Sequence, residues 1–485
     1  MENTIRDKYT AVIGLEVHAQ LLTHSKIYNS DSTVFGNKPN SNVGVITLGH
    51  PGTLPKLNIK VVEYAIRMGL ACNCDISREQ IFDRKNYFYP DLPKGYQITQ
   101  DRTPICVNGF VPVSPRDGEP RDIRLNRIHI EEDAGKSIHL PEEEDTLVDY
   151  NRAGVPLIEI VTEPDIRTSA EAYAFLTEIR RLVRYLDICD GNMEEGSLRC
   201  DANISVMLNG AKEYGKKVEV KNMNSIRNVQ RAIDHEIERQ ISVIENGGQI
   251  QSETRTFDAS NGTTAGMRTK EELNDYRYFP DPDLSPLHIS EDWLATITQA
   301  MPQLPAALFS KYVAEYGLPE YDAQVLTDTK EIALYFDRLC QHTDNYKAAS
   351  NWVMGPVKSY LNENSINMDE FTLEAAKLGQ LINLVGEGNI SFSVASQQLF
   401  PALIKSANDV SALQLAEELG LLKDGDDTMI SQWVEEVMAL YPDKVVAYRK
   451  GQKKLLGMFM GEVMKKSNGK ADPKATNDVL LSKLG

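Results

Sequence analysis

Alternation of apolar and polar positions predicts several strands in the first 290 residues of the chain. In residues 12–21 apolar side chains alternate with three polar ones, Glu16, His18 and Gln20. The same period of two recurs in residues 198–206 and 217–221, and residues 123–130 are also strand-like. A period of two is typical of strands that turn one side to a core and the other to a polar environment.

A short apolar run at residues 155–161 predicts a further, more deeply buried strand that carries one carboxylate, Glu159. Burial of a lone carboxylate is costly unless the group is protonated, paired or bound to a metal. Either the strand is less buried than its composition indicates, or Glu159 has a partner. We favour the second interpretation.

Helical periodicity appears in residues 61–70 and after the capping-box sequence Thr168-Ser169-Ala170-Glu171, and again in residues 225–245, which end at two glycines. From about residue 291 the pattern is helical almost throughout. The sequence therefore predicts an α+β protein. Its parts are a mixed or antiparallel sheet domain with flanking helices at residues 1–290, an all-helical domain at 291–408 and a small helical tail at 409–485.

Composition indicates a cytoplasmic protein with reduced cysteines. No stretch approaches the roughly 18 apolar residues of a membrane span, and residues 1–8 lack a basic region followed by an apolar one, so we expect neither a membrane segment nor a secretory signal. The 485 residues contain only six cysteines, with no C-x-x-C pair for structural zinc.

Charge is distributed unevenly along the chain. The net charge is −18, yet residues 444–485 hold ten basic and three acidic side chains. This asymmetry favours a tail that faces nucleic acid, with a solvated lysine face as the alternative. The candidate phosphate contacts are Lys450, Lys453, Lys454, Lys465, Lys466 and Lys470.

Ionisable side chains recur on the polar sides of the predicted strands: Glu16 with His18, Glu131 or Glu132, Glu159, Asp201 with Asn203, and Glu219. Each alone is compatible with the wet face of an antiparallel sheet. Together they suit a hard divalent ion such as Mg²⁺ or Mn²⁺ and a metal-dependent phosphoryl transfer. Four cationic side chains are available for nucleotide phosphates: Lys85, Arg199, Lys217 and Lys221. Spacing alone does not show that these strands converge.

Two short motifs fail on inspection. The stretch Ala134-Gly135-Lys136-Ser137 resembles the end of a P-loop, but Ile130 stands where the first glycine is required. His129-Ile130-Glu131 matches the H-x-E of zinc deaminases, but no P-C-x-x-C follows.

Several longer motifs resemble the B subunit of the bacterial aspartyl/glutamyl-tRNA(Asn/Gln) amidotransferase, in order and over essentially the full length. They are VIGLEVH at 12–18, FDRKNYFYPD at 82–91, HIEEDAGKS at 129–137, NRAGVPLIEIVTEP at 151–164, MEEGSLRCDAN at 193–203, EVKN at 219–222 and DYRYFPDP at 275–282. The tail resembles that family's YqeY-like tRNA-binding domain.

This resemblance implies a reaction in two steps. The side-chain carboxylate of Glu on tRNA(Gln), or of Asp on tRNA(Asn), would be phosphorylated with ATP and Mg²⁺ or Mn²⁺, and ammonia would then displace the phosphate. An amidase A subunit would supply the ammonia, and a small C subunit would complete a heterotrimer. By similarity the metal ligands, and with them the catalytic residues, would be Glu16, His18, Glu132, Glu159 and Glu219, and Lys85 and Tyr87 would contact the nucleotide.

Some points stay open. Strand alternation would group Glu131, rather than Glu132, with His129. Many relatives carry paired cysteines that would hold zinc between the first strand and the P-G-x-L-P loop, but residues 27–52 contain none, so we expect no zinc. Two other functions are alternatives to tRNA-dependent amidation. One is a subunit that binds tRNA and assembles the complex without catalysing a reaction, and the other is an ATP-dependent ligase that acts on a small carboxylate.

Overall fold

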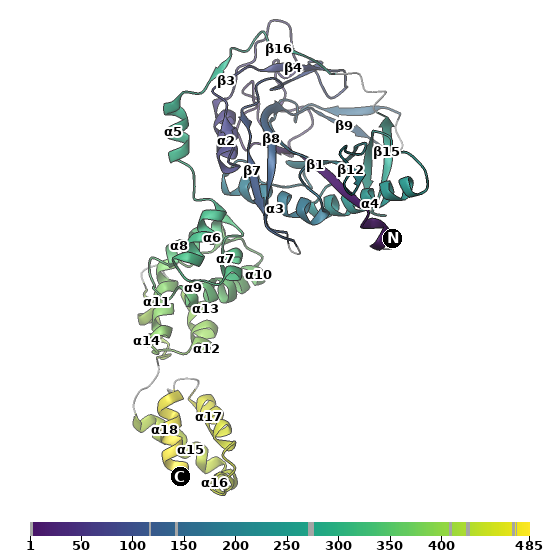
Figure 1. The fold of residues 1–485 in the computed structure, drawn as a ribbon. Coiled ribbons are helices and arrows are strands. Elements are labelled where there is room, and N and C mark those ends of the chain that lie inside the picture. Colours follow the sequence, from purple (N-terminus) through teal and green to yellow (C-terminus); the bar gives the residue numbers. More distant parts are fainter. Residues whose placement is uncertain are drawn as a thin grey trace. The chain divides into compact units, whose positions relative to one another are not determined.

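The structure is a computed structural model, and it describes residues 3–115, 118–140, 144–269, 276–406, 410–422, 427–467, 471 and 473–485. The chain divides into two compact units, residues 1–304 and 305–485. Strands are confined to the first unit among the described residues, and the second unit is helical there (Figure 1).

A ten-stranded sheet forms the centre of the first unit, with the order β15-β14-β13-β12-β1-β11-β8-β6-β2 and β7 paired to β8. Neighbouring strands are antiparallel except β13 and β14. The five strands that matter for the site are β1 (Tyr9–Gln20), β8 (Arg121–Glu132), β11 (Pro156–Thr162), β12 (Leu198–Leu208) and β13 (Val218–Lys221). The others are β2 (Asp75–Ile76), β6 (Cys106–Val107), β7 (Phe110–Val113), β14 (Glu253–Asp258) and β15 (Thr263–Thr269).

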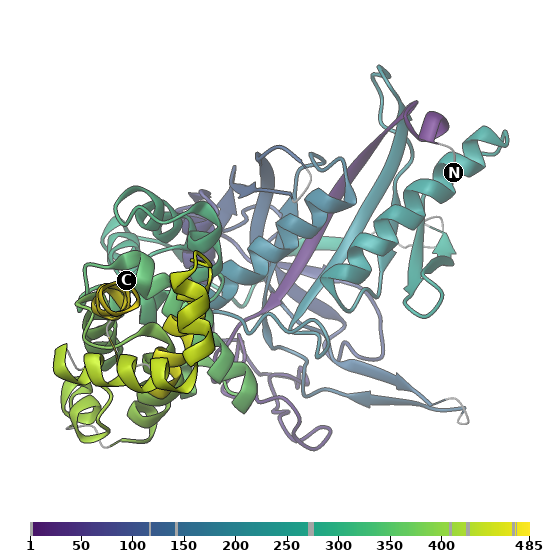
Figure 2. The same cartoon turned by 90° about the horizontal axis from the view of Figure 1, so that it is seen from below.

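Helices α3 (Ser169–Tyr185) and α4 (Ile226–Glu245) lie across one face of this sheet (Figure 2). Their N-termini are capped by Thr168 and Ser225, whose side chains accept backbone N–H groups three residues on. Apolar side chains of the helices join those of the alternating strands in one buried core. The opposite face of the strands therefore carries the polar side chains.

A three-stranded sheet of β4 (Asp83–Asn86), β5 (Tyr96–Thr99) and β16 (Arg277–Pro280) lies next to β8. The hairpin of β9 (Lys136–His139) and β10 (Thr146–Asp149) follows β8, and β3 (Glu79–Gln80) pairs with β17 (Leu287–His288). Helix α1 (Asn3–Arg6) precedes the sheet, and helix α2 (Ile59–Ala71) packs against β8 and against α5 (Glu291–Gln299). The chain therefore packs on the sheet domain up to and including α5.

The second unit begins with short helices. They are α6 (Pro305–Ala314), α7 (Glu320–Leu326), α8 (Lys330–Leu339), α9 (Tyr346–Trp352), α10 (Lys358–Asn364), α11 (Ala375–Gly386), α12 (Phe392–Val394), α13 (Phe400–Lys405) and α14 (Ala412–Glu418). Helices α9 and α10 are joined by a π-helical segment at Val353–Val357, and α12 and α13 by another at Ala395–Leu399. The last four helices have a core of their own: α15 (Asp427–Leu440), α16 (Pro442–Arg449), α17 (Leu455–Lys466) and α18 (Pro473–Leu484).

The predicted α+β class, with a sheet domain followed by helices, is confirmed. The boundaries at residues 290 and 408 stay predictions, although Ile297 of α5 is buried in the core of the sheet domain. No helix within the described ranges is long and apolar enough to cross a membrane.

Candidate active site

Four ionisable side chains form a row across the centre of the large sheet. The strand register makes His18 of β1 the direct partner of Arg199 on β12 and of Glu159 on β11. Glu159 is in turn the direct partner of His129 on β8. Because directly opposite residues of antiparallel strands project from the same face, all four lie on the face away from α3 and α4.

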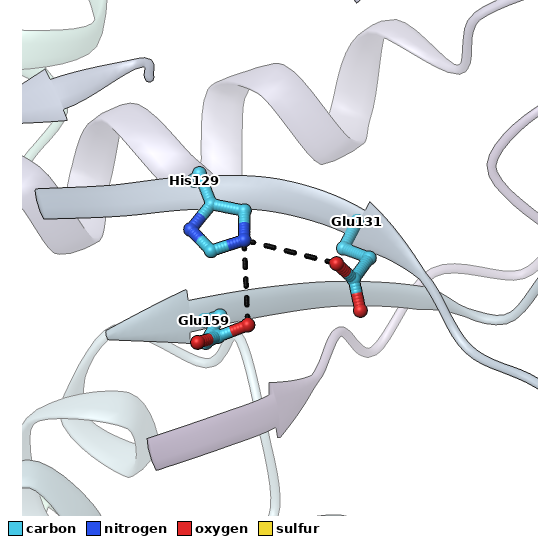
Figure 3. A group of neighbouring side chains, drawn as sticks. All are labelled: His129, Glu131 and Glu159. Carbon is cyan, nitrogen blue, oxygen red and sulfur yellow. Dashed lines mark ion pairs between the residues drawn. The ribbon is translucent and has the colours of Figure 1, made fainter. Parts of the chain in front are cut away.

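Two imidazoles converge on one carboxylate in this row. Nε2 of His18 lies 3.4 Å from Oε2 of Glu159, and Nε2 of His129 lies 3.3 Å from the same oxygen. Nε2 of His129 is also 3.8 Å from Oε2 of Glu131, two residues along β8 (Figure 3). Glu159 lies in the apolar strand β11 and needs a partner for its charge. That partner is a pair of histidines.

The charges of these groups are strongly coupled. Burial by itself raises the pKa of Glu159, but His129 and His18 outweigh it and hold this pKa well below its usual range. Burial lowers the pKa of His129, yet Glu159 and Glu131 raise it to about 9. Each shift has the same physical cause, since opposite charges stabilise one another where water is excluded.

Glu131 connects the row to the three-stranded sheet. Its Oε1 accepts a hydrogen bond of 3.1 Å from Nε2 of Gln97 on β5, and its Oε2 lies 4.0 Å from Nζ of Lys85 on β4. The Lys85 ammonium lies 4.8 Å from the centre of the Tyr276 ring, which contacts the ring of Tyr87 at 5.4 Å. A cation and partly exposed aromatic rings thus border the carboxylates.

A second acidic cluster lies one row further along the same face. Glu16 is the register partner of Asp201, and carboxylate oxygens of both lie within 4.8 Å of one another and of a Glu219 oxygen. Burial, with Glu159 and Glu219, raises the pKa of Glu16. This carboxylate is therefore incompletely compensated by its surroundings.

Neutral hydrogen-bond donors hold two carboxylates of the second cluster. Nδ2 of Asn203 donates to Oε1 of Glu16 at 2.8 Å, and Oγ1 of Thr254 donates to Oε2 of Glu219 at 2.9 Å. Nζ of Lys221 lies 2.5 Å from Oδ2 of Asp201 and 3.1 Å from Oε1 of Glu219.

Glu132 is not brought into either cluster. Its Oε1 accepts hydrogen bonds from Nζ of Lys94 at 2.5 Å and from the backbone N–H of Ile98 at 2.8 Å. Strand alternation explains this position, because successive residues of β8 point to opposite faces. Of the two adjacent glutamates, the structure therefore places Glu131 with His129 and Glu159.

The remaining cationic candidates have different environments. Nη2 of Arg199 is 2.9 Å from Oδ2 of Asp133, which also accepts a hydrogen bond from Gln20 at 2.7 Å. This network keeps Arg199 at the edge of the row. Lys217 is exposed in the residues that precede β13.

The tail lysines that fall within the described ranges are exposed. Nζ of Lys453 lies 4.1 Å from the centre of the Tyr448 ring, and Nζ of Lys466 lies 2.8 Å from Oε2 of Glu436. Lys450, Lys454 and Lys465 are exposed as well. Lys470 lies outside the described residues, as does Asp275 at the start of the DYRYFPDP motif.

Both clusters have the chemistry of divalent-ion sites. His129, Glu131 and Glu159 can present one ligand atom each within 4.8 Å, as can Glu16, Asp201 and Glu219. The carboxylate oxygens of both clusters are ligands that suit Mg²⁺ and Mn²⁺. Nδ1 of His129 is buried without a hydrogen-bond partner among the described residues, and an orphaned polar atom of this kind is compatible with a site that binds a further group.

Sequence reasoning missed His129 as a member of the site and left Glu131 as the less favoured alternative. Their signal was the i, i+2 spacing on a predicted strand, which places both on one face. The missing information was the register, since only the pairing of β8 with β11 brings His129 opposite Glu159.

Two family models match the chain. The GatB/GatE catalytic domain covers residues 11–295, and the GatB domain covers residues 334–484. The B subunit of the aspartyl/glutamyl-tRNA(Asn/Gln) amidotransferase from Chlorobium limicola is 50% identical over 477 residues, which is 98% of this chain and 99% of that protein. The protein of the same name from Thermodesulfovibrio yellowstonii is 47% identical over 477 residues, with the same two coverages.

Proposed function

This chain belongs to the family of aspartyl/glutamyl-tRNA(Asn/Gln) amidotransferase B subunits, and from this premise we propose that it activates the side-chain carboxylate of a mischarged aminoacyl-tRNA with ATP for amidation by ammonia. The product would be Gln-tRNA(Gln), Asn-tRNA(Asn) or both. As an amide-forming reaction coupled to ATP, this is ligase chemistry in the service of protein biosynthesis.

The observation that carries the proposal is the pair of carboxylate clusters on one sheet face, bordered by cations. A carboxylate oxygen is a poor nucleophile towards an anionic phosphate, so charge neutralisation is the main requirement of the first step. Divalent ions held by Glu16 and Glu219 in one cluster, and by Glu131 and Glu159 with the adjacent imidazoles of His129 and His18 in the other, would supply Lewis-acid stabilisation of that charge. In this proposal Glu131 takes the position that the resemblance gave to Glu132.

The chain's own cations would complete the neutralisation. Lys85 lies beside Glu131 and is bordered by the Tyr276 and Tyr87 rings, an arrangement that suits a nucleotide with its phosphates at the ammonium and its base near the rings. Arg199, held by Asp133, is positioned at the other end of the row for a second anionic group.

The atoms balance over two steps. One side-chain carboxylate oxygen of the aminoacyl group attacks the γ-phosphorus of ATP, and ADP leaves, which gives an acyl phosphate. Ammonia then attacks the acyl carbon, and inorganic phosphate departs with the original carboxylate oxygen. The amide retains the other oxygen.

The partners follow from the same premise. An amidase A subunit would deliver ammonia and a small C subunit would complete a cytoplasmic heterotrimer. The exposed tail lysines, Lys450, Lys453, Lys454, Lys465 and Lys466, together with Lys470, would contact the tRNA backbone.

Glu159→Gln and Glu219→Gln in the assembled complex test this proposal. Each should lower the rate of ATP-dependent amidation by at least about a hundredfold, since even outer-shell partners of metal ligands contribute about 10–100-fold. Binding of tRNA and assembly should be unchanged. Glu163→Gln, on the residue that follows β11, is the matched control. Full activity of both site variants would favour an assembly subunit without chemistry.

A further inference from the structure

The Lys221 ammonium occupies the position where a cation would bind in the second cluster. Its Nζ contacts Oδ2 of Asp201 at 2.5 Å and Oε1 of Glu219 at 3.1 Å, and both carboxylates belong to the acidic group completed by Glu16. A divalent ion bound by these carboxylates would lie about 2.0–2.6 Å from their oxygens, where the ammonium would repel it. The ammonium and the ion therefore compete for one position.

Two of the three carboxylates of this cluster, Glu16 and Glu219, are held by neutral hydrogen-bond donors, and the lysine is partly exposed. Asn203 and Thr254 donate hydrogen bonds to Glu16 and Glu219, so one oxygen of each of these two carboxylates already has a partner. The Lys221 side chain is 35% exposed and has a flexible four-carbon stem. It can withdraw towards solvent without any change in the sheet.

We propose that Lys221 is an internal counter-ion that neutralises the Glu16, Asp201 and Glu219 cluster until a divalent ion binds and displaces it. The cluster would otherwise bring three carboxylates together without compensation, at a cost in stability. Displacement leaves the ammonium beside the bound ion, where it can pair with an anionic ligand. This inference rests on the proposed function for the nature of the ion, but not on nucleotide or tRNA binding.

Lys221→Met in the full chain tests the competition directly. Mn²⁺ binding, followed by titration calorimetry and by electron paramagnetic resonance without nucleotide, should become about tenfold tighter at one site, because a charge-assisted hydrogen bond no longer has to be broken. Lys216→Met removes an exposed lysine five residues away and should leave the Mn²⁺ affinity unchanged. Unchanged or weaker binding in Lys221→Met would overturn the inference.

A measurement on the unaltered chain keeps the test independent of the stability of this variant. Amine labelling resolved by peptide mass spectrometry should show Lys221 several-fold more reactive at saturating Mn²⁺ than without it, with Lys216 constant. Protection of Lys221 by Mn²⁺, or no change, contradicts displacement. If neither the chain nor its variants bind Mn²⁺, the proposed function and the inference both fail. If Mn²⁺ binds equally to all of them, only the inference fails.

Discussion

Glu159 and His129 face each other as a register pair across β11 and β8, with Oε2 and Nε2 3.3 Å apart. This contact resolves how a carboxylate can lie inside an apolar strand. His18 approaches the same oxygen from β1, so the carboxylate is compensated from both neighbouring strands. The pair lies on the polar face of the sheet, which is the face away from α3 and α4.

Exchange of the two adjacent glutamates for glutamine should separate their roles. Glu131→Gln removes a carboxylate from the group with His129 and Glu159 and should weaken Mn²⁺ binding by about tenfold or more. Glu132→Gln should leave Mn²⁺ binding unchanged and instead lower the free energy of unfolding by about 1–3 kcal/mol, because it leaves the largely buried Lys94 ammonium without its counter-charge. Calorimetric titration and urea unfolding measure the two effects. The reverse pattern would return Glu132 to the metal site.

The large sheet was predictable in its elements but not in its order. Alternation in residues 12–21 and 198–206 correctly indicated strands with one polar face, and the cap at Thr168 marked the start of α3. These signals are local. Nothing local shows that β1 pairs with both β11 and β12, which follow it by well over one hundred residues.

The site was predictable to the same extent. Glu16 and His18 were identified from one strand, and Glu159 from the cost of burying its charge. Their convergence depends on long-range register, and so does the identity of Glu159's partners, which are the imidazoles of His18 and His129. Lys85 comes from a separate sheet, so its position next to Glu131 had no sequence signal of its own.

A buried lysine predicts a specific pH dependence of stability. Lys26 is fully buried, and its Nζ donates to the carbonyl oxygen of Asn42 at 2.7 Å. Burial lowers its pKa from 10.5 to about 8. Between these values the unfolded chain binds the proton and the folded chain does not, so this residue makes stability rise with pH, by about 2 kcal/mol from pH 8 to pH 10.

The measurement is urea unfolding at both pH values for the wild type and for Lys26→Met. The variant should lack this increment, so the difference between the two proteins should change by about 2 kcal/mol over the window. Lys56→Met replaces an exposed lysine and should behave as the wild type. Parallel pH profiles of the wild type and Lys26→Met would show that Lys26 stays charged in the folded chain.

The tail lysines should differ in their contribution to tRNA binding. Lys454→Ala should weaken binding of every tRNA alike and reduce the slope of log affinity against log salt by about 0.7–0.9. Lys466→Ala should have a smaller effect, because Glu436 already neutralises this ammonium at 2.8 Å. Filter binding between about 50 and 200 mM salt measures both slopes. Equal slopes for the wild type and Lys454→Ala would remove this lysine from the interface.

The central claim is that the side-chain carboxylate is phosphorylated before ammonia attacks it. Its most direct test follows oxygen atoms. Glutamate carrying ¹⁸O in the side-chain carboxylate is charged on tRNA(Gln), and the assembled complex is supplied with ATP and glutamine. Phosphorylation predicts that each inorganic phosphate released during amidation carries one ¹⁸O atom from the carboxylate. Amide product accompanied by phosphate without ¹⁸O would contradict the account.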